Sequence, residues 1–487
     1  MKKIIKSLAI AAITITALQS CNDARDINQD GVISDEVVWE TIEDLQLGLN
    51  GVYAAYTYEN DINFNAVFTD NIKRGIDNNG QGQGLYNFNL IPSTSAATSI
   101  FAGRYAGINY ANRVLEGVEE LEFEDEATIQ EENHIQAQLL TLRAMYHFDL
   151  FLYYTEDYRA PNSLAIPIMD YVPTIDAAPE RNTVAEVLAF INQDLEQASQ
   201  LISNTVGSNF YINRNTIRAV QAKVALIEGD YPTVIDLTDG LVADYPLSNQ
   251  SDYVDMYLDL IEGESIFTLS RQQDDSEVAS LFYFNTVELA GNPYLEVSNG
   301  LYNELEPSDI DGDLQDEEDI RFDVIIHPET QIVNTNSPEN IILLNKYPGS
   351  QEPLLNDIKV IRSSEMLLIN AEAKARSNDF AGAAQAIKDL RDVRFGEATP
   401  LPTYNNLDEA LTDILEERRK ELAFEGKRFL DLKWIGGDLN IGVSRNETDC
   451  ASFSAPCGLP RSSYRFTLPI PQAELNANPN ITQNNGY

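Results

Sequence analysis

Two stretches of this sequence carry the residue types that bind sugars. Aromatic rings cover the apolar faces of a sugar, and planar amide or guanidinium groups hydrogen-bond its hydroxyls. Residues 64–90 and residues 282–302 are both rich in such side chains. We therefore predict that the two stretches form one ligand site. Its candidate contact residues are Asp70, Arg74, Asn78, Asn79, Tyr86, Tyr283 and Tyr294.

Four of these residues carry the sharpest form of the prediction. Tyr86 and Tyr294 are the expected stacking pair, one from each stretch. Arg74 and Asn78 are the expected polar contacts, because each planar group can bridge two hydroxyls. For any single aromatic ring the alternative is packing in the hydrophobic core, since tyrosine and phenylalanine serve both purposes.

No catalytic pattern accompanies these stretches. The three histidines, His134, His147 and His327, lie in no metal-binding spacing such as HExxH, and GxSxG, P-loop and GxGxxG motifs are absent. His147 falls in a helical apolar stripe, which favours a packed residue. With 77 acidic residues, a glycosidase-like carboxylate pair can be found almost anywhere. We expect a binding protein that requires no cofactor, and a lipid-anchored glycoside hydrolase is the alternative.

A short acidic run could hold a structural calcium ion. Asp309, Asp311 and Asp313 alternate along the chain, and closely spaced carboxylates are ligands that calcium prefers. The alternative is a solvated acidic loop without an ion.

Repeated helical segments are expected to position the loops. Residues 222–231 and 371–380 each contain a small-residue helix followed by a tight turn, with Asp230 and Asp379 in equivalent places. Small residues let paired helices approach closely, as in tetratricopeptide-like repeats. The repeat predicts an all-α fold of tetratricopeptide-like helix pairs with long irregular loop insertions. Within the chain, residues 60–95 are expected to be irregular.

The same patterns divide the chain into five parts. Helical periodicity is found on both sides of a long stretch that is rich in Pro, Gly, Asp and aromatic residues. The predicted parts are a signal peptide (1–20), a polar tether (21–36), an N-terminal helical region (37–243), an irregular loop-rich insertion (244–360) and a C-terminal helical region (361–487).

The first residues have the pattern of a lipoprotein signal. Lysines precede an apolar run at residues 8–18, which is too short to span a bilayer. Residues 18–21 follow with a small residue directly before Cys21. A cysteine at the cleavage point predicts lipidation of Cys21 and stable membrane anchoring by two or more acyl chains. The alternative is a plain secretory signal beside a chance cysteine.

Export would allow the two remaining cysteines to form a disulfide. Cys450 and Cys457 stand seven residues apart in a proline-containing loop, and no zinc-binding pattern accompanies them. An exported protein permits a disulfide, so we expect one that closes this loop, with two free thiols as the alternative.

The net charge of −44 restricts the partners. Nucleic-acid binding draws most of its affinity from basic surface, so we exclude it as a function. A strongly negative surface also favours a neutral glycan, such as a β-glucan, over a uronate or sulfated one.

The most distinctive pattern spans residues 411–434, LTDILEERRKELAFEGKRFLDLKW. It predicts a charged amphipathic helix, a stop at Gly426 and a second short helix that ends near Trp434. Asn406 and Glu409, three residues apart, have the spacing of a capping box at the start of the first helix.

This segment resembles the C-terminal signature of the SusD/RagB family, the surface glycan-binding lipoproteins of Bacteroidetes. Residues 142–150 (LRAMYHFDL) and 467–480 resemble two further stretches of that family. The signature residues matched here are Glu417, Arg418, Arg419, Glu421, Leu422, Phe424, Glu425, Gly426, Arg428, Phe429, Asp431, Leu432, Lys433 and Trp434.

The resemblance implies a function that the residues alone do not. It implies a non-catalytic lipoprotein at the cell surface, anchored in the outer membrane. Such a protein captures a polysaccharide or oligosaccharide and delivers it to a TonB-dependent, SusC-like transporter. Some RagB-type members capture peptides instead, which is the nearest alternative, and a purely structural scaffold is another.

Overall fold

The computed structural model describes residues 39–203, 207–272, 275, 277–283, 293–308, 318–349, 355–451 and 454–487. In this part of the chain most regular structure is helical, and the strands form three two-stranded antiparallel pairs. The prediction of an all-α fold is therefore confirmed. None of the helices found in the described ranges is long and apolar enough to cross a membrane.

Two groups of predictions fall outside the described residues. These are the signal peptide and tether with Cys21, and the calcium residues Asp309, Asp311 and Asp313. Both stay predictions.

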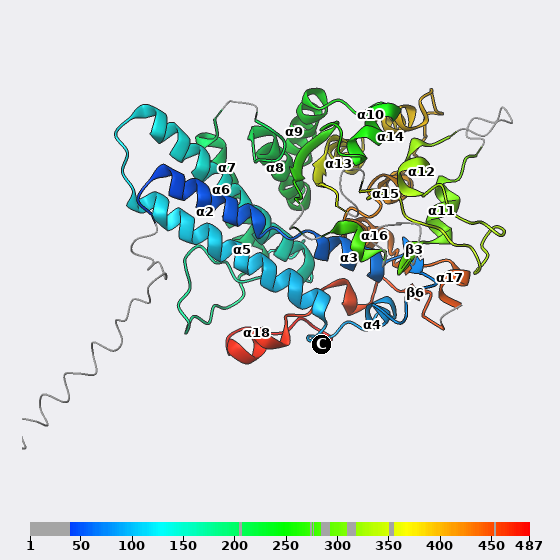
Figure 1. The fold of residues 1–487 in the computed structure, drawn as a ribbon, viewed down its shortest axis with the longest axis horizontal. Helices are drawn as coiled ribbons and strands as arrows, with labels where there is room; N and C mark the ends of the chain where they lie inside the picture. The colour runs from blue at the N-terminus through cyan, green and yellow to red at the C-terminus, as the bar shows by residue number, and fades with distance from the viewer. Residues whose placement is uncertain are drawn as a thin grey trace, which may run out of the picture.

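The N-terminal helices form one end of the molecule, where α2, α5, α6 and α7 lie side by side (Figure 1). Capping boxes begin two of these helices, at Thr41 with Asp44 and at Thr183 with Glu186. In α6, His147 is fully buried, as its place in an apolar stripe predicts. The helices of this part are α2 (Ile42–Ala54), α3 (Glu59–Phe68), α4 (Gln83–Tyr86), α5 (Ser95–Glu120), α6 (Glu126–Tyr154) and α7 (Val184–Leu201).

The repeated segments form two helix pairs, α8 (Arg214–Glu228) with α9 (Tyr231–Asp244) and α13 (Ser363–Arg376) with α14 (Phe380–Phe395). The pairs stack through α9 and α13, although more than 100 residues separate them in sequence. The repeated aspartates cap the second helix of each pair: Asp230 accepts a hydrogen bond from the Thr233 amide and Asp379 from the Gly382 amide. The sequence repeat thus marks one helix–turn–helix unit used twice.

Two regions that we expected to be irregular contain regular elements. The prediction for residues 60–95 is wrong for α3, which is buried on nearly all sides and so shows no amphipathic stripe in the sequence. The insertion at 244–360 contains short helices and strands among its loops. These elements are α10 (Gln250–Tyr257), β2 (Ser265–Leu269), the 3₁₀ helix η2 (Val278–Leu281), β3 (Leu295–Val297), α11 (Asn299–Leu305), α12 (Ile320–Ile325) and β4 (Ile358–Arg362).

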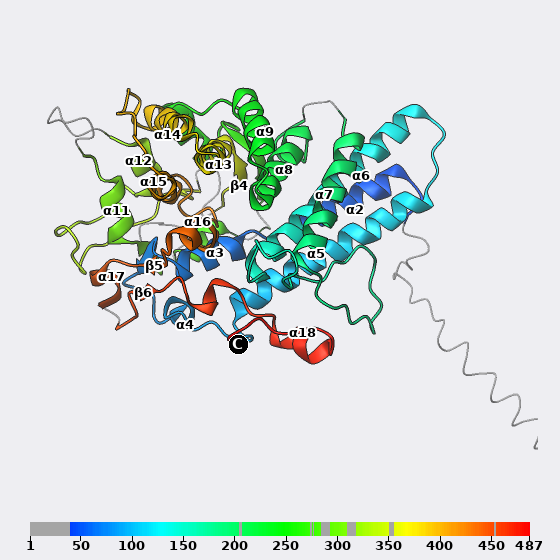
Figure 2. The ribbon, with the colours of Figure 1, turned by 180° about the vertical axis from the view of Figure 1, so that it is seen from behind.

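The C-terminal region returns across the molecule and ends beside α18, as the view from behind shows (Figure 2). The helix α15 begins where the sequence predicts, since the Asn406 side chain accepts a hydrogen bond from the Glu409 amide at 3.0 Å. The elements of this region are α15 (Leu407–Glu421), α16 (Arg428–Leu439), β5 (Val443–Ser444), α17 (Glu447–Ala451), β6 (Gly458–Leu459), the 3₁₀ helix η3 (Tyr464–Phe466) and α18 (Gln472–Ala477).

The charged residues at the turn between α15 and α16 are buried. Glu421 accepts hydrogen bonds from Arg362 and Arg394, each at 2.9 Å, and Glu425 pairs with Arg362 and Lys346. Burial alone would raise the pKa of the Glu421 carboxyl, but the guanidiniums of Arg394 and Arg362 hold it well below its usual range. We call the buried ionic contacts around Glu421 and Glu425 the ion network. It joins the turn to β4 and α14.

Candidate functional site

The fold brings the two predicted sugar-binding stretches together. Strand β1 (Ile72–Arg74), from the first stretch, pairs antiparallel with β3, from the second, and Arg74 lies opposite Leu295. Beyond the strands, the Gly75 amide donates to the Tyr294 carbonyl at 2.9 Å. We call this contact the β1–β3 junction. It confirms that the stretches are neighbours, which sequence alone could only propose.

Asn78 shapes the turn that follows β1. Its side-chain oxygen accepts from Arg74 Nε at 2.9 Å, and its amide donates to the carbonyls of Gln81 and Tyr294 at 3.1 and 3.0 Å. At Gly75 a Cβ atom would lie 2.1 Å from the Pro293 carbonyl oxygen, so only glycine allows this close approach. The turn is therefore held against the second stretch from both ends.

Four of the seven predicted contact residues are buried in the protein. Asn78 forms the contacts just given, and Asp70 pairs with Arg428 at 2.8 and 2.9 Å. Tyr86 lies under a guanidinium, and the Tyr283 hydroxyl donates to a backbone carbonyl. For both tyrosines the structure shows the alternative of core packing. Burial would raise the pKa of the Asp70 carboxyl, but the guanidiniums of Arg428 and Arg419 lower it.

The other three residues keep access to solvent. Asn79 is exposed in a left-handed conformation with φ of 51°, and Arg74 and Tyr294 are half-buried. Ile76, which we did not predict as a contact residue, lies between Arg74 and Asn79 in sequence and is 65% exposed. The junction thus presents one guanidinium, one amide and one tyrosine that sequence reasoning identified.

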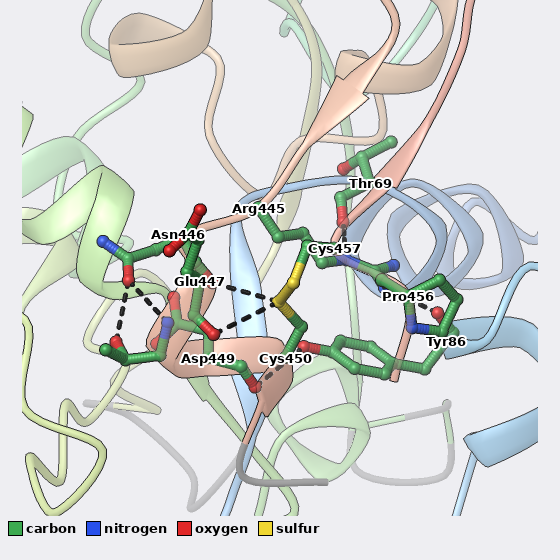
Figure 3. The surroundings of a disulfide bond; sticks show 10 residues. Thr69, Tyr86, Arg445, Asn446, Glu447, Asp449, Cys450, Pro456 and Cys457 are labelled. Atoms are coloured by element: carbon green, nitrogen blue, oxygen red, sulfur yellow. Dashed lines mark hydrogen bonds between the residues drawn. A yellow bond between two sulfur atoms is a disulfide. The ribbon is translucent and has the colours of Figure 1, made fainter. Parts of the chain in front are cut away.

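A hairpin made of β5, α17 and β6, which we call the disulfide hairpin, lies against the first stretch (Figure 3). Cys450 and Cys457, the pair expected to close a loop, form a disulfide with Cα atoms 5.3 Å apart. The Arg445 amide donates to the Cys457 carbonyl at 2.8 Å, and its guanidinium lies 3.8 Å from the centre of the Tyr86 ring. That guanidinium also donates to the Thr69 carbonyl at 2.8 Å. The hairpin therefore fixes the backbone of the first stretch.

The same hairpin reaches the second stretch. The Asp449 carboxylate accepts from the amide of Asn299, at the start of α11, at 3.0 Å. The Tyr86 hydroxyl donates to the Asp449 carbonyl at 3.4 Å, which links both stretches through one residue. Burial raises the pKa of the Asp449 carboxyl, although the Asn299 side chain counteracts it.

A pocket of about 570 Å³ adjoins the turn after β1. Asn60 and Asn63 reach it from α3, Gln83 from α4, and Ser95 and Ser99 from the first turns of α5. Residues three or four apart share a helix face, so each pair presents two polar groups to one side. Among the described residues, none of the side chains that line this pocket is ionisable. We call it the neutral pocket.

Sequence reasoning missed the neutral pocket. Its polar groups come from α3, α4, α5 and the segment that precedes α5, and they are amides and hydroxyls of ordinary spacing. The one available signal was the run Ser93-Thr94-Ser95, which leads into a long helix that begins at Ser95 and also lines the pocket.

The chemistry of the neutral pocket is that of reversible hydrogen bonding. Amides and hydroxyls supply both donors and acceptors, which match the hydroxyls of a sugar. Within the described ranges, no group of three metal-ligating side chains is assembled anywhere. The pocket also lacks a carboxylate in its lining, so it holds no acid–base pair of the glycosidase kind.

Comparisons with known proteins identify the family. Residues 24–227 match a family described as starch-binding and associating with the outer membrane, and residues 321–487 match the SusD family. Two SusD-like proteins of Formosa agariphila are 25% and 24% identical, over 86% and 98% of this chain and 89% and 98% of their own. The chain therefore belongs to the SusD/RagB family.

Solved structures have the same fold. A SusD superfamily protein from Bacteroides thetaiotaomicron matches 91% of this chain and 100% of its own with a TM-score of 0.75 and 25% identity. A laminarin-binding SusD-like protein matches 92% of this chain and 100% of its own with a TM-score of 0.68 and 21% identity.

The family signature and the candidate site occupy different places. Glu421 and Glu425 of the signature belong to the ion network, and Arg428 is paired with Asp70. The neutral pocket contains no signature residue. The signature therefore identifies the fold, while the ligand must be inferred from the pocket.

Proposed function

We propose that this protein captures a neutral polysaccharide or oligosaccharide, such as a β-glucan, at the cell surface. The observation that carries the proposal is the neutral pocket: a chain of net charge −44 keeps ionisable side chains out of the lining described for it. A neutral polyol gains hydrogen bonds there without desolvating a charge. The starch-binding description of the family and the laminarin-binding relative of the same fold support this ligand class.

Location and delivery form the second part of the proposal. Cys21 carries the lipid anchor, and the protein delivers its glycan to a SusC-like TonB-dependent transporter in the outer membrane. The support is the lipoprotein signal at residues 1–21 and the family description, which names association with the outer membrane. Replacing Cys21 with Ala should release the protein from the membrane fraction, and a variant that still pellets completely would contradict the anchor.

The rival functions fit the neutral pocket less well. A peptide brings charged termini and side chains, for which the lining offers no ionic partner. A hydrolase needs two carboxyl groups beside the scissile bond, and the lining offers none. Binding without cleavage is therefore the function that we propose, and laminarin incubated with the protein should release no reducing ends above a buffer control.

The test uses isothermal calorimetry with laminarin and with an unrelated peptide mixture. Each lost hydrogen bond is worth about 1 kcal/mol, so Asn60→Ala and Asn63→Ala should each weaken laminarin binding about fivefold. Gln385→Ala, which removes an exposed amide on α14, is the matched control and should change nothing. If the folded parent binds the peptides and no neutral glycan, the proposed function is wrong. If it binds laminarin and both pocket variants bind equally well, only the position of the site is wrong.

A further inference from the structure

Helix α5 borders three hollows in succession. Its first turns line the neutral pocket, and the next turns line a cleft of about 420 Å³ against Pro167 and Pro179. Its last turns line a pocket of about 690 Å³ that also contains Trp39. The second and third hollows share Pro173 and Thr174, so they adjoin each other beside the helix.

One face of α5 runs through all three hollows. The lining residues on this face recur at intervals of three or four, which keeps them on one side of a helix. In order they are Ser95, Ser99, Ala102, Ala106, Tyr110 and Arg113. Small side chains thus leave the helix surface open from the neutral pocket as far as Tyr110. The rise from Ser99 to Tyr110 is about 17 Å at 1.5 Å per residue.

The far pocket is lined by an indole that packs closely against two helices. A Cβ atom on Gly117 of α5 would lie 2.6 Å from Trp39 Cγ, and one on Gly48 of α2 would lie 2.9 Å from its Cη2. The absence of side chains at these two glycines lets the ring rest directly on both backbones. The indole therefore packs against the backbones of α2 and α5, and it also lines the pocket.

The rest of this pocket suits a sugar ring. Tyr110 is 50% exposed and lines the same hollow as Trp39, so two aromatic rings can contact a ligand. Arg113, Glu116 and Glu120 supply donors and acceptors beside them. Two carboxylates against one guanidinium disfavour a uronate or sulfated ring and leave an uncharged hexose as the matching ligand.

We infer that Trp39 and Tyr110 form a second contact site for a neutral glycan chain whose other end occupies the neutral pocket. The chain lies along the open face of α5 between the two. This inference rests on the proposed function, because it assigns both sites to the same glycan. Two contacts on one chain raise the affinity for a long glycan through effective concentration, whereas a short glycan gains nothing.

The experiment compares laminarin with laminaribiose, which is too short to reach both sites. Stacking on one ring is worth about fivefold in affinity, so Trp39→Ala and Tyr110→Ala should each weaken laminarin binding about fivefold and leave laminaribiose binding unchanged. Tyr211→Ala is the matched control, since Tyr211 is 49% exposed and lies outside the three hollows. Thermal melting checks the fold, and Tyr110→Ala keeps the Trp39 packing if Trp39→Ala does not fold.

The outcomes separate the inference from the proposed function. A folded parent that binds neither glycan overturns both. If the folded Tyr110→Ala and Trp39→Ala variants bind laminarin as tightly as the parent does, the second site alone is overturned. An equal loss for laminaribiose would also overturn it, because the short glycan would then bind at Trp39 and Tyr110 without reaching the neutral pocket.

Discussion

The ion network and the neutral pocket differ in the kind of polar group that they contain. In the network, Arg362, Arg394 and Glu421 are almost completely buried, and both guanidiniums pair with the Glu421 carboxylate. In the neutral pocket, amides and hydroxyls line an open hollow without any charge among the described side chains. A buried charge cannot lose its partner without a large penalty, whereas an amide near solvent exchanges partners at little cost. The network is therefore suited to hold the fold and the pocket to hold a ligand.

This difference explains why the most recognisable residues do not mark the site. The signature is dense in charges that look available for a ligand when the sequence is read alone. Each is committed inside the protein instead, as Arg428 is to Asp70.

The strongest way to break the comparison is to remove the centre of the network. Glu421→Ala removes a buried carboxylate that pairs with Arg362, Arg394 and Arg321, and leaves Glu264 as the acceptor that Arg362 and Arg394 still share. The loss should cost about 3–5 kcal/mol in the free energy of unfolding. Chemical denaturation measures this loss. The matched control is Asp244→Ala, which breaks an exposed pair with Arg218 and should cost less than about 1 kcal/mol. Equal losses in the two variants would show that the network does not stabilise the fold.

Much of the scaffold could be predicted from sequence because its signals are local. The Asn406 cap, the repeated Asp230 and Asp379, and the stripe of α15 each depend on residues a few positions apart. Tyr86 could not be placed, because its burial depends on Arg445, which is 359 residues away. The neutral pocket was missed for the same reason: α3, α4 and α5 each contribute a few ordinary polar groups.

The disulfide hairpin tests whether the site depends on the scaffold beside it. A double variant, Cys450→Ser with Cys457→Ser, should lose about 2 kcal/mol of stability, since the closed loop is short. It should also bind laminarin more weakly, because Arg445 and Asp449 hold both sides of the β1–β3 junction. Denaturation and calorimetry measure the two effects. Treating the parent with a reductant should reproduce them, and unchanged affinity in the folded variant would separate the hairpin from the site.

Acid should distinguish the buried ion pairs of the scaffold from the neutral pocket with the smallest change to the molecule. Glu365, a buried residue of α13 outside the ion network, pairs with Lys223 and Lys427. Burial acts to raise the pKa of Glu365, but these two lysines lower it from 4.5 to about 2. Because the folded pKa is the lower one, its stabilisation is present above pH 4.5 and is lost as the pH falls toward about 2. Melting curves should fall over that window, and Glu365→Gln should fall less steeply. Glycan affinity should stay flat from about pH 5 to about pH 8, where carboxylates remain ionised. A sloping affinity there would place a group that titrates between about pH 5 and about pH 8 in the site.

The pairing of β1 with β3 also sets an order for biogenesis. Ile72 and Val297 are partners across more than 200 residues, and the Phe429 amide donates to the Asn65 side chain across 364. Contacts of such separation form late, after the intervening chain is available. The N-terminal half therefore cannot form the β1–β3 junction, or the contact of α3 with α16, until the later segments have been synthesised. A chain truncated before α16 keeps the residues that line the neutral pocket but loses the Phe429 contact to α3, so it should bind glycan more weakly.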